Sequence, residues 1–414
     1  MPEIKTIKRR KIESSSVMNK FMAEYFLDLD KCARTGKKKV AWCTSVGPAE
    51  LLLSMGFAVH YPENHGAMLG ATRMATDLIP IATAEGYSPD ICSYLTSDIG
   101  SYLSGNTPLT KAYGIKEIPK PDVLIFDTNQ CRDVGDWMEW YARKLDIPIL
   151  GIYAPKYPNE ITETHIQSLK QQTMDLVEPL EKISGNKFDI DKFREVMKLS
   201  HQCTELWGKV LDTATATPSP LTFFDGTIQM GPAVVLRGTQ RAVDYYELLL
   251  AELEQRIADG VGAVDNEKFR LYWDGMPIWG RLRANSELFA SLNSSVIAST
   301  YCNSWIFSSF DEADPFYSMA KAYLEIFIVR SEDSKVEYIE KMIKKFKIDG
   351  VLYHDAKTCP ANSNCRYGMN KRLEKSTGIP SLVINGDLND LRCVSDEQMR
   401  TNIEAFIEQL EENK

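Results

Sequence analysis

The chain has 414 residues, which is more than one ordinary hydrophobic core accommodates and predicts two domains of about 200 residues each. Hydrophobic residues make up 44% of the chain and charged residues 25%, as is typical of globular proteins. The net charge of −9 argues against a nucleic-acid partner, and we interpret the basic run at residues 5–11 as a solvated N-terminal arm.

Membrane proteins and secreted proteins are also disfavoured. No apolar stretch reaches the ~18 residues that a membrane helix needs, and there is no signal-peptide pattern, so we expect no membrane association and a cytoplasmic location. In that compartment, nine cysteines indicate free thiols or metal ligands rather than disulfides.

In the first half of the chain, apolar runs of strand length alternate with helical patterns. A helix is expected over residues 17–35, and Pro48 suits the first turn of the next helix. A mostly helical stretch covers residues 161–213, and Pro218 and Pro220 end it. The strands predicted in this half are residues 37–44, 57–60, 122–127 and 148–153, with a helix at 136–145 among those that separate them.

The alternation resumes after a long helix predicted over residues 243–259. Because alternating strands and helices imply parallel sheets covered on both faces, we expect an α/β protein. It would contain two Rossmann-like or flavodoxin-like domains with additional helices, residues 1–215 and residues 216–414. In the second half we predict strands at 270–273, 295–299, 351–354 and 381–384, and helices at 317–330, 336–346, 363–375 and 397–412.

Nucleotide-binding motifs are missing from the sequence. No Gly-x-Gly-x-x-Gly follows a predicted strand, and there is no Walker A sequence. We therefore expect that the chain itself binds neither NAD nor ATP.

Three cysteines, Cys92, Cys131 and Cys359, each stand where a strand or turn should lead into a helix. Cys131 is 39 residues after Cys92, and Cys359 follows 228 residues later, so only the fold could bring them together. Three thiolates meeting in a cleft would suit a [4Fe–4S] cluster with one iron left open for a substrate. The alternative is that they are small apolar residues of the core.

The surroundings of these cysteines resemble the 2-hydroxyacyl-CoA dehydratase and benzoyl-CoA reductase superfamily, from about residue 20 to the C-terminus. The spacing of several motifs carries this resemblance. They are Val40-Ala41-Trp42-Cys43-Thr44-Ser45, Tyr61-Pro62-Glu63-Asn64-His65, Gly86-Tyr87-Ser88, Pro119-Lys120-Pro121-Asp122 and Thr377-Gly378-Ile379-Pro380.

The resemblance implies a set of site residues. Cys92, Cys131 and Cys359 match the family's cluster ligands, in a cleft between the two domains. Glu63 matches an acid/base beside the cluster, and Ser45 a serine that helps to hold the substrate hydroxyl; an exposed loop glutamate and a helix N-cap serine are the alternatives. His65 could hydrogen-bond the thioester carbonyl or have no role.

Other residues have more open assignments. Cys43, Cys302 and Cys365 could hold a second cubane, giving a double-cubane [8Fe–9S] cofactor, although Cys365 is predicted to lie inside a helix. We interpret Cys32, Cys203 and Cys393 as packing or surface residues. Arg237 and Trp279 could bind coenzyme A or line the acyl pocket, or could be structural.

The activity implied by the resemblance is that of the catalytic subunit of an (R)-2-hydroxyacyl-CoA dehydratase. In such enzymes a separate, ATP-hydrolysing iron–sulfur activator delivers one electron, which turns the acyl-CoA thioester into a ketyl radical and allows water to leave. The implied partners are therefore an acyl-CoA, the activator, and a second subunit that is either homologous or identical.

Three alternatives remain at this stage. Arg237-Gly238-Thr239 and Asp244-Tyr245-Tyr246 look more like the benzoyl-CoA reductase branch, whose enzymes reduce an aromatic ring. A double-cubane reductase of small molecules belongs to the same superfamily. The chain could also be a cluster carrier or scaffold whose partner performs the chemistry.

Overall fold

Two parallel four-stranded sheets form the framework of the protein. The computed structural model describes residues 10–412, so residues 5–9 of the basic run lie outside the described part. The first sheet has the order β2-β1-β3-β4, and Ala41 in its centre lies opposite Val59 and Val123. Its strands are β1 (Val40–Cys43), β2 (Ala58–His60), β3 (Val123–Asp127) and β4 (Ile149–Ile152).

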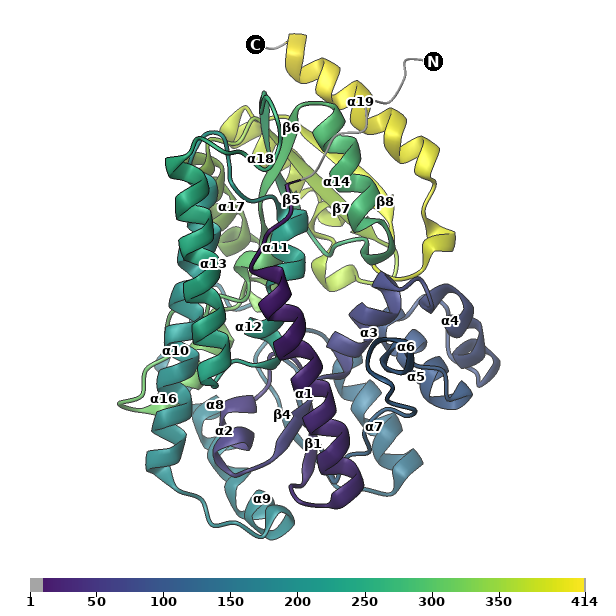
Figure 1. Ribbon diagram of the computed structural model, residues 1–414, viewed down its shortest axis with the longest axis vertical. Helices are drawn as coiled ribbons and strands as arrows, with labels where there is room; N and C mark the ends of the chain where they lie inside the picture. Colours follow the sequence, from purple (N-terminus) through teal and green to yellow (C-terminus); the bar gives the residue numbers. More distant parts are fainter. Residues whose placement is uncertain (1–9, 413–414) are drawn as a thin grey trace.

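The second sheet repeats this arrangement. Its order is β6-β5-β7-β8, and Leu271 of its central strand lies opposite Val296 and Gly350. In Figure 1 the first sheet occupies the lower half of the molecule and the second sheet the upper half. The strands are β5 (Phe269–Asp274), β6 (Ser294–Ser299), β7 (Gly350–Ala356) and β8 (Ser381–Gly386).

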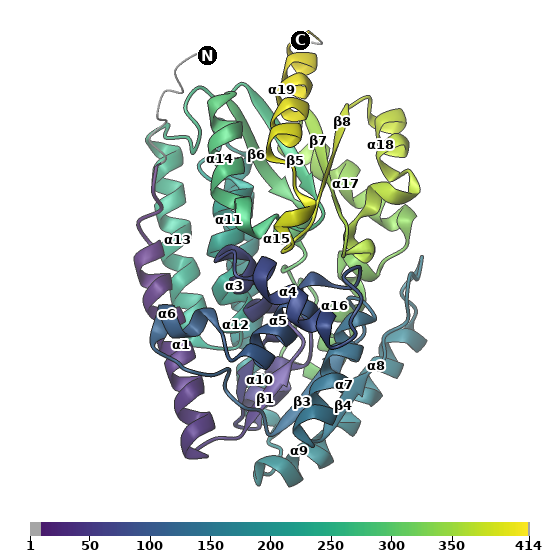
Figure 2. The same ribbon diagram turned by 90° about the vertical axis from the view of Figure 1, so that its right-hand side faces the viewer.

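Helices of the N-terminal half cover the first sheet and reach toward the second. The helix α3 (Pro62–Ala71) contacts the turn η2 (Trp279–Arg281) of the other half, and α3, α4 and α5 lie at mid-height in both views (Figures 1 and 2). The remaining helices of this part are α1 (Ser15–Thr35), α2 (Ala49–Ser54), α4 (Ala75–Ala84), α5 (Ser93–Ser104), α6 (Pro108–Tyr113), α7 (Asp133–Leu145), α8 (Glu163–Asp175) and α9 (Val177–Ser184).

Long helices connect the two halves. In Figure 1, α10 (Ile190–Asp212) and α13 (Gln240–Ala258) run side by side along the molecule, and they pack on each other. The helix α16 (Pro315–Glu325) packs on α8, although it follows the second sheet's β6 in the chain. We retain the division at residues 215 and 216, directly after the turn η1 (Thr213–Thr215), as a proposal.

The remaining helices surround the second sheet and the site. They are α11 (Phe223–Gln229), α12 (Gly231–Val235), α14 (Leu282–Ser291), α15 (Thr300–Asn303), α17 (Glu332–Phe346), α18 (Met369–Thr377) and α19 (Asp396–Glu412), with the short turns η3 (Phe327–Val329), η4 (Pro360–Asn362), η5 (Asn364–Tyr367) and η6 (Leu391–Cys393).

The local sequence explains these elements. All residues of β1 and β3 are buried, as expected for strands covered on both faces. The helix α7 buries Val134, Trp137 and Tyr141 on one face, with acidic residues in its first turn and basic residues in its last, where they favour the helix dipole.

The predicted fold class is confirmed, with one correction to the elements. Cys92 is the N-cap residue of α5 and is reached from α4 through a turn, not a strand. The helix predicted at residues 363–375 begins only at Met369, so Cys365 lies in the turn η5 and not in a helix. Gly368, with a φ of 85°, separates the turn from α18. Among the described residues, no helix is long and apolar enough to span a membrane.

Candidate active site

The structure brings Cys92, Cys131 and Cys359 to one place. Cys92 caps α5, Cys131 lies in the turn between β3 and α7, and Cys359 lies between β7 and η4. All three are half-buried and line the same cavity of about 580 Å³, which we call the cysteine cavity. Two of them therefore follow central strands, at the sheet edge where α/β proteins place their sites.

The three thiols share one electrostatic environment. Burial raises the pKa of Cys92, and the nearby Cys131 and Cys359 raise it further. Burial likewise raises the pKa of Cys131 to about 12 and that of Cys359 to about 12. Each sulfur is also approached by the backbone N–H three residues later, from Leu95, Val134 and Asn362 respectively, and this contact lowers the pKa of its thiol. Helix N-termini are places that stabilise a thiolate.

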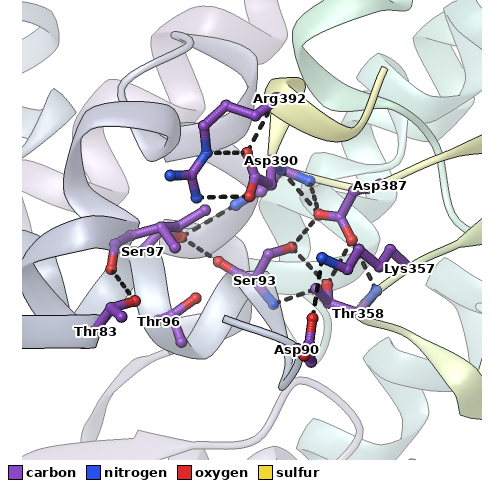
Figure 3. Close-up of polar contacts among 12 residues, drawn as sticks. Thr83, Asp90, Ser93, Thr96, Ser97, Lys357, Thr358, Asp387, Asp390 and Arg392 are labelled. Carbon is purple, nitrogen blue, oxygen red and sulfur yellow. Dashed lines mark hydrogen bonds and ion pairs between the residues drawn. The ribbon is translucent and has the colours of Figure 1, made fainter. Parts of the chain in front are cut away.

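Backbone hydrogen bonds tie the three cysteine segments together. The N–H of Cys92 donates to Oδ2 of Asp133 at 3.0 Å, which joins the segments of Cys92 and Cys131. The N–H of Ser93 donates to Oγ1 of Thr358 at 3.1 Å, which joins the segments of Cys92 and Cys359. Figure 3 shows the second junction, with the 2.9 Å ion pair between Lys357 and Asp90 beside it.

The donor set fits an iron–sulfur cluster better than a single metal ion. Within residues 10–412, no three His, Cys, Asp or Glu side chains are arranged to bind one ion. The cysteines of a cubane bind different iron atoms and are therefore spaced more widely than the ligands of a single ion. Three thiols that line one cavity from three different segments suit such a cluster.

A second cavity of about 590 Å³, which we call the reaction cavity, adjoins the cysteine segments. Gln130 and Asn362 line the reaction cavity, whereas their chain neighbours Cys131 and Ser363 line the cysteine cavity. The cysteine segments therefore form part of the wall between the two cavities. Unpartnered buried atoms mark the reaction cavity, namely Oγ of Ser45, Oε1 of Gln130 and Oδ1 of Asn362.

Glu63 is the acidic group of the reaction cavity. It lies in the first turn of α3 with 9% of its surface exposed, and the backbone N–H of Ser45 donates to its Oε2 at 2.5 Å. Burial raises the pKa of Glu63 to about 7, although hydrogen bonding to Ser45 lowers it. The carboxylate is close enough to Cys131 to raise the pKa of that thiol. A carboxyl group with this pKa can both give and take a proton near neutral pH.

Ser45 and Trp279, two of the candidates from the sequence, line the reaction cavity. The Ser45 hydroxyl lies beside the Glu63 carboxyl but makes no hydrogen bond of ordinary geometry, so it is available to another molecule. The indole N–H of Trp279 donates to the hydroxyl of Tyr94, and the ring packs edge-on against Tyr301 at 6.2 Å.

Arg237 is placed differently from a coenzyme A ligand. Its guanidinium is 2% exposed and donates to Oε1 of Glu50 at 2.8 Å. The same group donates to the carbonyls of Ser45 at 2.8 Å and Gly47 at 3.0 Å. All its nitrogens are thus engaged inside the protein, where they fix the loop that carries Ser45.

His65 also lies away from both cavities. It is fully buried, with Nδ1 at 2.5 Å from Oδ1 of Asp98 and Nε2 at 2.9 Å from Oγ1 of Thr107. The other oxygen of Asp98 accepts hydrogen bonds from Trp137 and Tyr141. This network links α3, α5 and α7, and the geometry favours a structural role for His65.

The remaining candidate cysteines are not brought together. Cys43 and Cys302 are buried in the core, and Oγ1 of Thr227 lies 3.7 Å from the sulfur of Cys302. Cys365 lies beside a separate group of core residues around β7 and α17. None of the three lines either cavity, so they offer no second cluster site comparable to the first.

Sequence reasoning missed several residues of this site. Tyr94, Tyr301 and Gln130 line the reaction cavity, and Asp387 lies behind the cysteine segments. The position of Gln130 next to Cys131 was a usable signal. Gly386-Asp387 is one of the motifs that carry the family resemblance, but the contacts of Asp387 with Thr358 and Ser93, 29 and 294 residues away, were not predictable from it.

Comparison with known proteins agrees with these features. The sequence pattern of the family described as 2-hydroxyglutaryl-CoA dehydratase, D-component, matches residues 44–410. The chain belongs to this family. The family's pattern thus covers all three cysteine segments and the first turn of α3, which carries Glu63.

Three relatives illustrate the breadth of the family. The (R)-2-hydroxyisocaproyl-CoA dehydratase alpha subunit of Clostridioides difficile is 32% identical, over 98% of both chains. Lactoyl-CoA dehydratase subunit alpha of Anaerotignum propionicum is 30% identical, over 93% of this chain and 94% of its own. A benzoyl-CoA reductase subunit of Thauera aromatica is 30% identical, over 97% of this chain and 96% of its own.

Proposed function

We propose that the chain is the cluster-binding catalytic subunit of an (R)-2-hydroxyacyl-CoA dehydratase. The observation that carries the proposal is the shared wall between the two cavities: three cysteines face one cavity, and the ionisable Glu63 faces the other. A substrate in the reaction cavity would then lie between a redox cofactor and a proton donor. Membership of a dehydratase family supports the same conclusion.

Cys92, Cys131 and Cys359 would hold a [4Fe–4S] cluster, which when bound supplies a low-potential electron to the thioester and an iron that polarises the leaving hydroxyl. Ser45 would hydrogen-bond the substrate hydroxyl through its unpartnered Oγ. Glu63, with a pKa of about 7, would give its proton to the departing hydroxyl, which leaves as water, and would then take the β-proton. The carboxyl group thereby returns to its starting state. Because the dehydration is redox-neutral overall, the electron given to the thioester would leave it again as the enoyl-CoA forms.

The proposal includes partners. Because the Clostridioides difficile relative is named as an alpha subunit, we propose a second, related subunit for this chain as well. We further propose an ATP-hydrolysing activator as the electron source, since the chain contains no nucleotide-phosphate loop of its own.

The decisive experiment is an anaerobic turnover assay. The purified protein is supplied with a 2-hydroxyacyl-CoA, a low-potential donor, ATP and an activator, and enoyl-CoA is measured by mass spectrometry. We expect product only when ATP and activator are both present. Turnover independent of both would contradict the proposal and indicate an ordinary hydratase.

Two controls in the same assay separate the alternatives. Benzoyl-CoA as substrate tests the ring reduction that the Thauera aromatica relative raises, because its product gains hydrogen and releases no water. Glu63→Gln should keep the iron content and lose about 10²-fold or more in turnover, the scale of a general acid/base. Cys131→Ala should lose iron and activity together.

A further inference from the structure

The wall of the reaction cavity is apolar away from Glu63. Three buried polar atoms of the lining lack an ordinary hydrogen-bond partner, namely Oγ of Ser45, Oε1 of Gln130 and Oδ1 of Asn362. Ser45 and Gln130 lie beside Glu63, and Gln130 and Asn362 lie on the segments of Cys131 and Cys359. Elsewhere the lining combines aliphatic side chains, aromatic rings and flexible thioethers. The methionines are Met18, Met22, Met68, Met230 and Met276.

Two cations belong to this lining among the residues that the structure describes, Arg73 and Arg283. Both are exposed: Arg73 donates to the carbonyl of Gly280 at 3.2 Å, and the Arg283 side chain is 85% exposed and paired with Glu287 at 2.8 Å. They therefore stand where the cavity opens to solvent. An anionic group deep in the cavity would find Glu63 and no partner of opposite charge.

We propose that the reaction cavity selects acyl groups that are uncharged and apolar beyond the 2-hydroxyl, and rejects acyl groups that end in a carboxylate. This inference rests on the proposed function, in that the ligand is taken to be an acyl-CoA. A carboxylate that is buried without a partner loses its hydration and gains nothing in exchange. A methionine-rich wall adapts to apolar groups of different shape, so branched and aromatic chains are both accommodated.

The test is a binding measurement, because binding needs neither electron nor activator. Isothermal titration of the anaerobic holoprotein compares 2-hydroxyisocaproyl-CoA, 2-hydroxyglutaryl-CoA and free coenzyme A. We expect the branched thioester to bind at least ~100-fold more tightly than the thioester with a terminal carboxylate, the scale of discrimination that a mismatched pocket provides. Equal or tighter binding of 2-hydroxyglutaryl-CoA would overturn the inference, as would binding of both no better than free coenzyme A.

The same measurement separates this inference from the proposed function. Tight binding of the apolar thioester without ATP-dependent turnover would refute the dehydratase function and leave the proposed selectivity unchanged.

A pair of variants at Met68 extends the test. Met68 is half-buried on the cavity face of α3, one turn beyond Asn64. Met68→Lys should bind 2-hydroxyglutaryl-CoA at least ~10-fold more tightly than its neutral match Met68→Gln, because the ammonium supplies the missing partner. No difference between them would contradict the placement of the acyl chain.

A second, independent observation concerns Asp387. This carboxylate is fully buried in the loop after β8, where its oxygens accept five hydrogen bonds (Figure 3). Oδ1 accepts from the hydroxyl of Ser93 at 2.6 Å, and Oδ2 from the N–H of Thr358 at 2.9 Å and its hydroxyl at 2.6 Å. The backbone N–H groups of Asn389 and Asp390 also donate to Oδ1, at 3.0 and 2.9 Å.

The partners of Asp387 are the chain neighbours of two cysteines. Ser93 follows Cys92 on the N-terminal half, and Thr358 precedes Cys359 on the C-terminal half. We infer that Asp387 is a positioning residue that fixes the spacing of the Cys92 and Cys359 segments for the cluster. Both side-chain oxygens of Asp387 accept hydrogen bonds from N–H and O–H groups. The NH2 group of an asparagine would instead face one set of these N–H donors, and no hydrogen bond could form there.

Asp387→Asn tests this role, with Asp390→Asn as the matched control. Asp390 is also buried and lies three residues further on, but its carboxylate accepts hydrogen bonds from Arg392, at 2.7 and 2.8 Å, rather than from Ser93 or Thr358. We expect Asp387→Asn to lose at least half of the iron per chain and to change the electron paramagnetic resonance spectrum of the reduced cluster. Asp390→Asn should retain both.

Full iron and an unchanged spectrum in Asp387→Asn would overturn the inference. If that variant fails to fold, Thr358→Val serves instead, since it removes one hydroxyl at constant size and should also alter the spectrum. Wild-type protein that takes up no iron and sulfide would overturn both this inference and the proposed cluster.

Discussion

Glu63 carries a pH dependence that follows from its burial. Its pKa is raised from 4.5 to about 7, so the folded chain holds a proton that the unfolded chain has released over that range. Stability contributed by this group is therefore full below the unfolded pKa and lost as the pH rises through about 7. Gln at this position cannot ionise and avoids the loss.

We predict that Glu63→Gln becomes more stable relative to wild type as the pH rises. Between about pH 5.5 and about pH 8 the relative gain in the free energy of unfolding should be about 2 kcal/mol. Denaturant unfolding of both proteins in the same metal-loading state measures it. Parallel pH profiles would show that the carboxyl group is not buried as described.

Arg237 and Glu50 form a buried ion pair. Removal of one partner leaves the charge of the other uncompensated inside the protein. Arg237→Met should lower the free energy of unfolding by about 3–5 kcal/mol, because it leaves the fully buried Glu50 uncompensated. Adding Glu50→Gln should recover part of that loss. A stable Arg237→Met protein with weakened coenzyme A binding would instead favour the role considered from the sequence.

At the scale of single residues, some features of the site were predictable from the sequence and others were not. Ser45 and Glu63 lie in short motifs near strand ends, so their place at the site was predictable. The environments of His65 and Arg237 were not, because each depends on partners from distant segments, such as Asp98 and Glu50. Residue type alone does not distinguish a guanidinium that binds phosphate from one that binds carbonyls.

At the scale of elements, α3 approaches the other half of the molecule at a glycine. A Cβ atom on Gly70 would lie 2.0 Å from Oδ1 of Asn389 and 2.8 Å from Cβ of Trp279. Gly70→Ala should therefore force α3 away from η2 and cost about 1–3 kcal/mol of stability. Thermal or denaturant unfolding measures this change.

Gly208 is the matched control for that substitution. It lies within α10, and a Cβ there would meet Ile306 at 3.7 Å, an ordinary contact. Gly208→Ala should be neutral or stabilise the protein by about 0.5–1 kcal/mol, since alanine favours the helix more than glycine does. Equal effects of the two substitutions would exclude a special contact at Gly70.

The strands were predictable because buried parallel strands appear as short apolar runs, as at Val123–Asp127. The segment before Cys92 contains Gly86 and Pro89 and is largely exposed, which suits a turn rather than a strand. Residues 363–368 were assigned to a helix because their composition does not reveal two successive tight turns. Turn geometry of this kind depends on contacts such as that of Ser363 with the N–H of Ala356.

At the scale of the whole molecule, the proposed cluster would be held by both halves and should therefore stabilise the folded chain. Removal of iron by a chelator should lower the melting temperature of wild-type protein, because the three thiols converge only in the folded state. Cys359→Ala should melt at the lower temperature with or without chelator. Iron analysis of the wild type should give ~4 atoms per chain rather than the ~8 of a double cubane.

The placement of Cys359 also has a consequence in time. Cys92 and Cys131 leave the ribosome at least 228 residues before Cys359 does, which at about 5–20 residues per second is about 10–50 s of synthesis. During that interval the first two thiols have no third partner, and the strand β7 that will present it does not yet exist. Insertion of the proposed cluster at these three positions would therefore await synthesis of the segment that carries Cys359, with the early cysteines kept reduced until then.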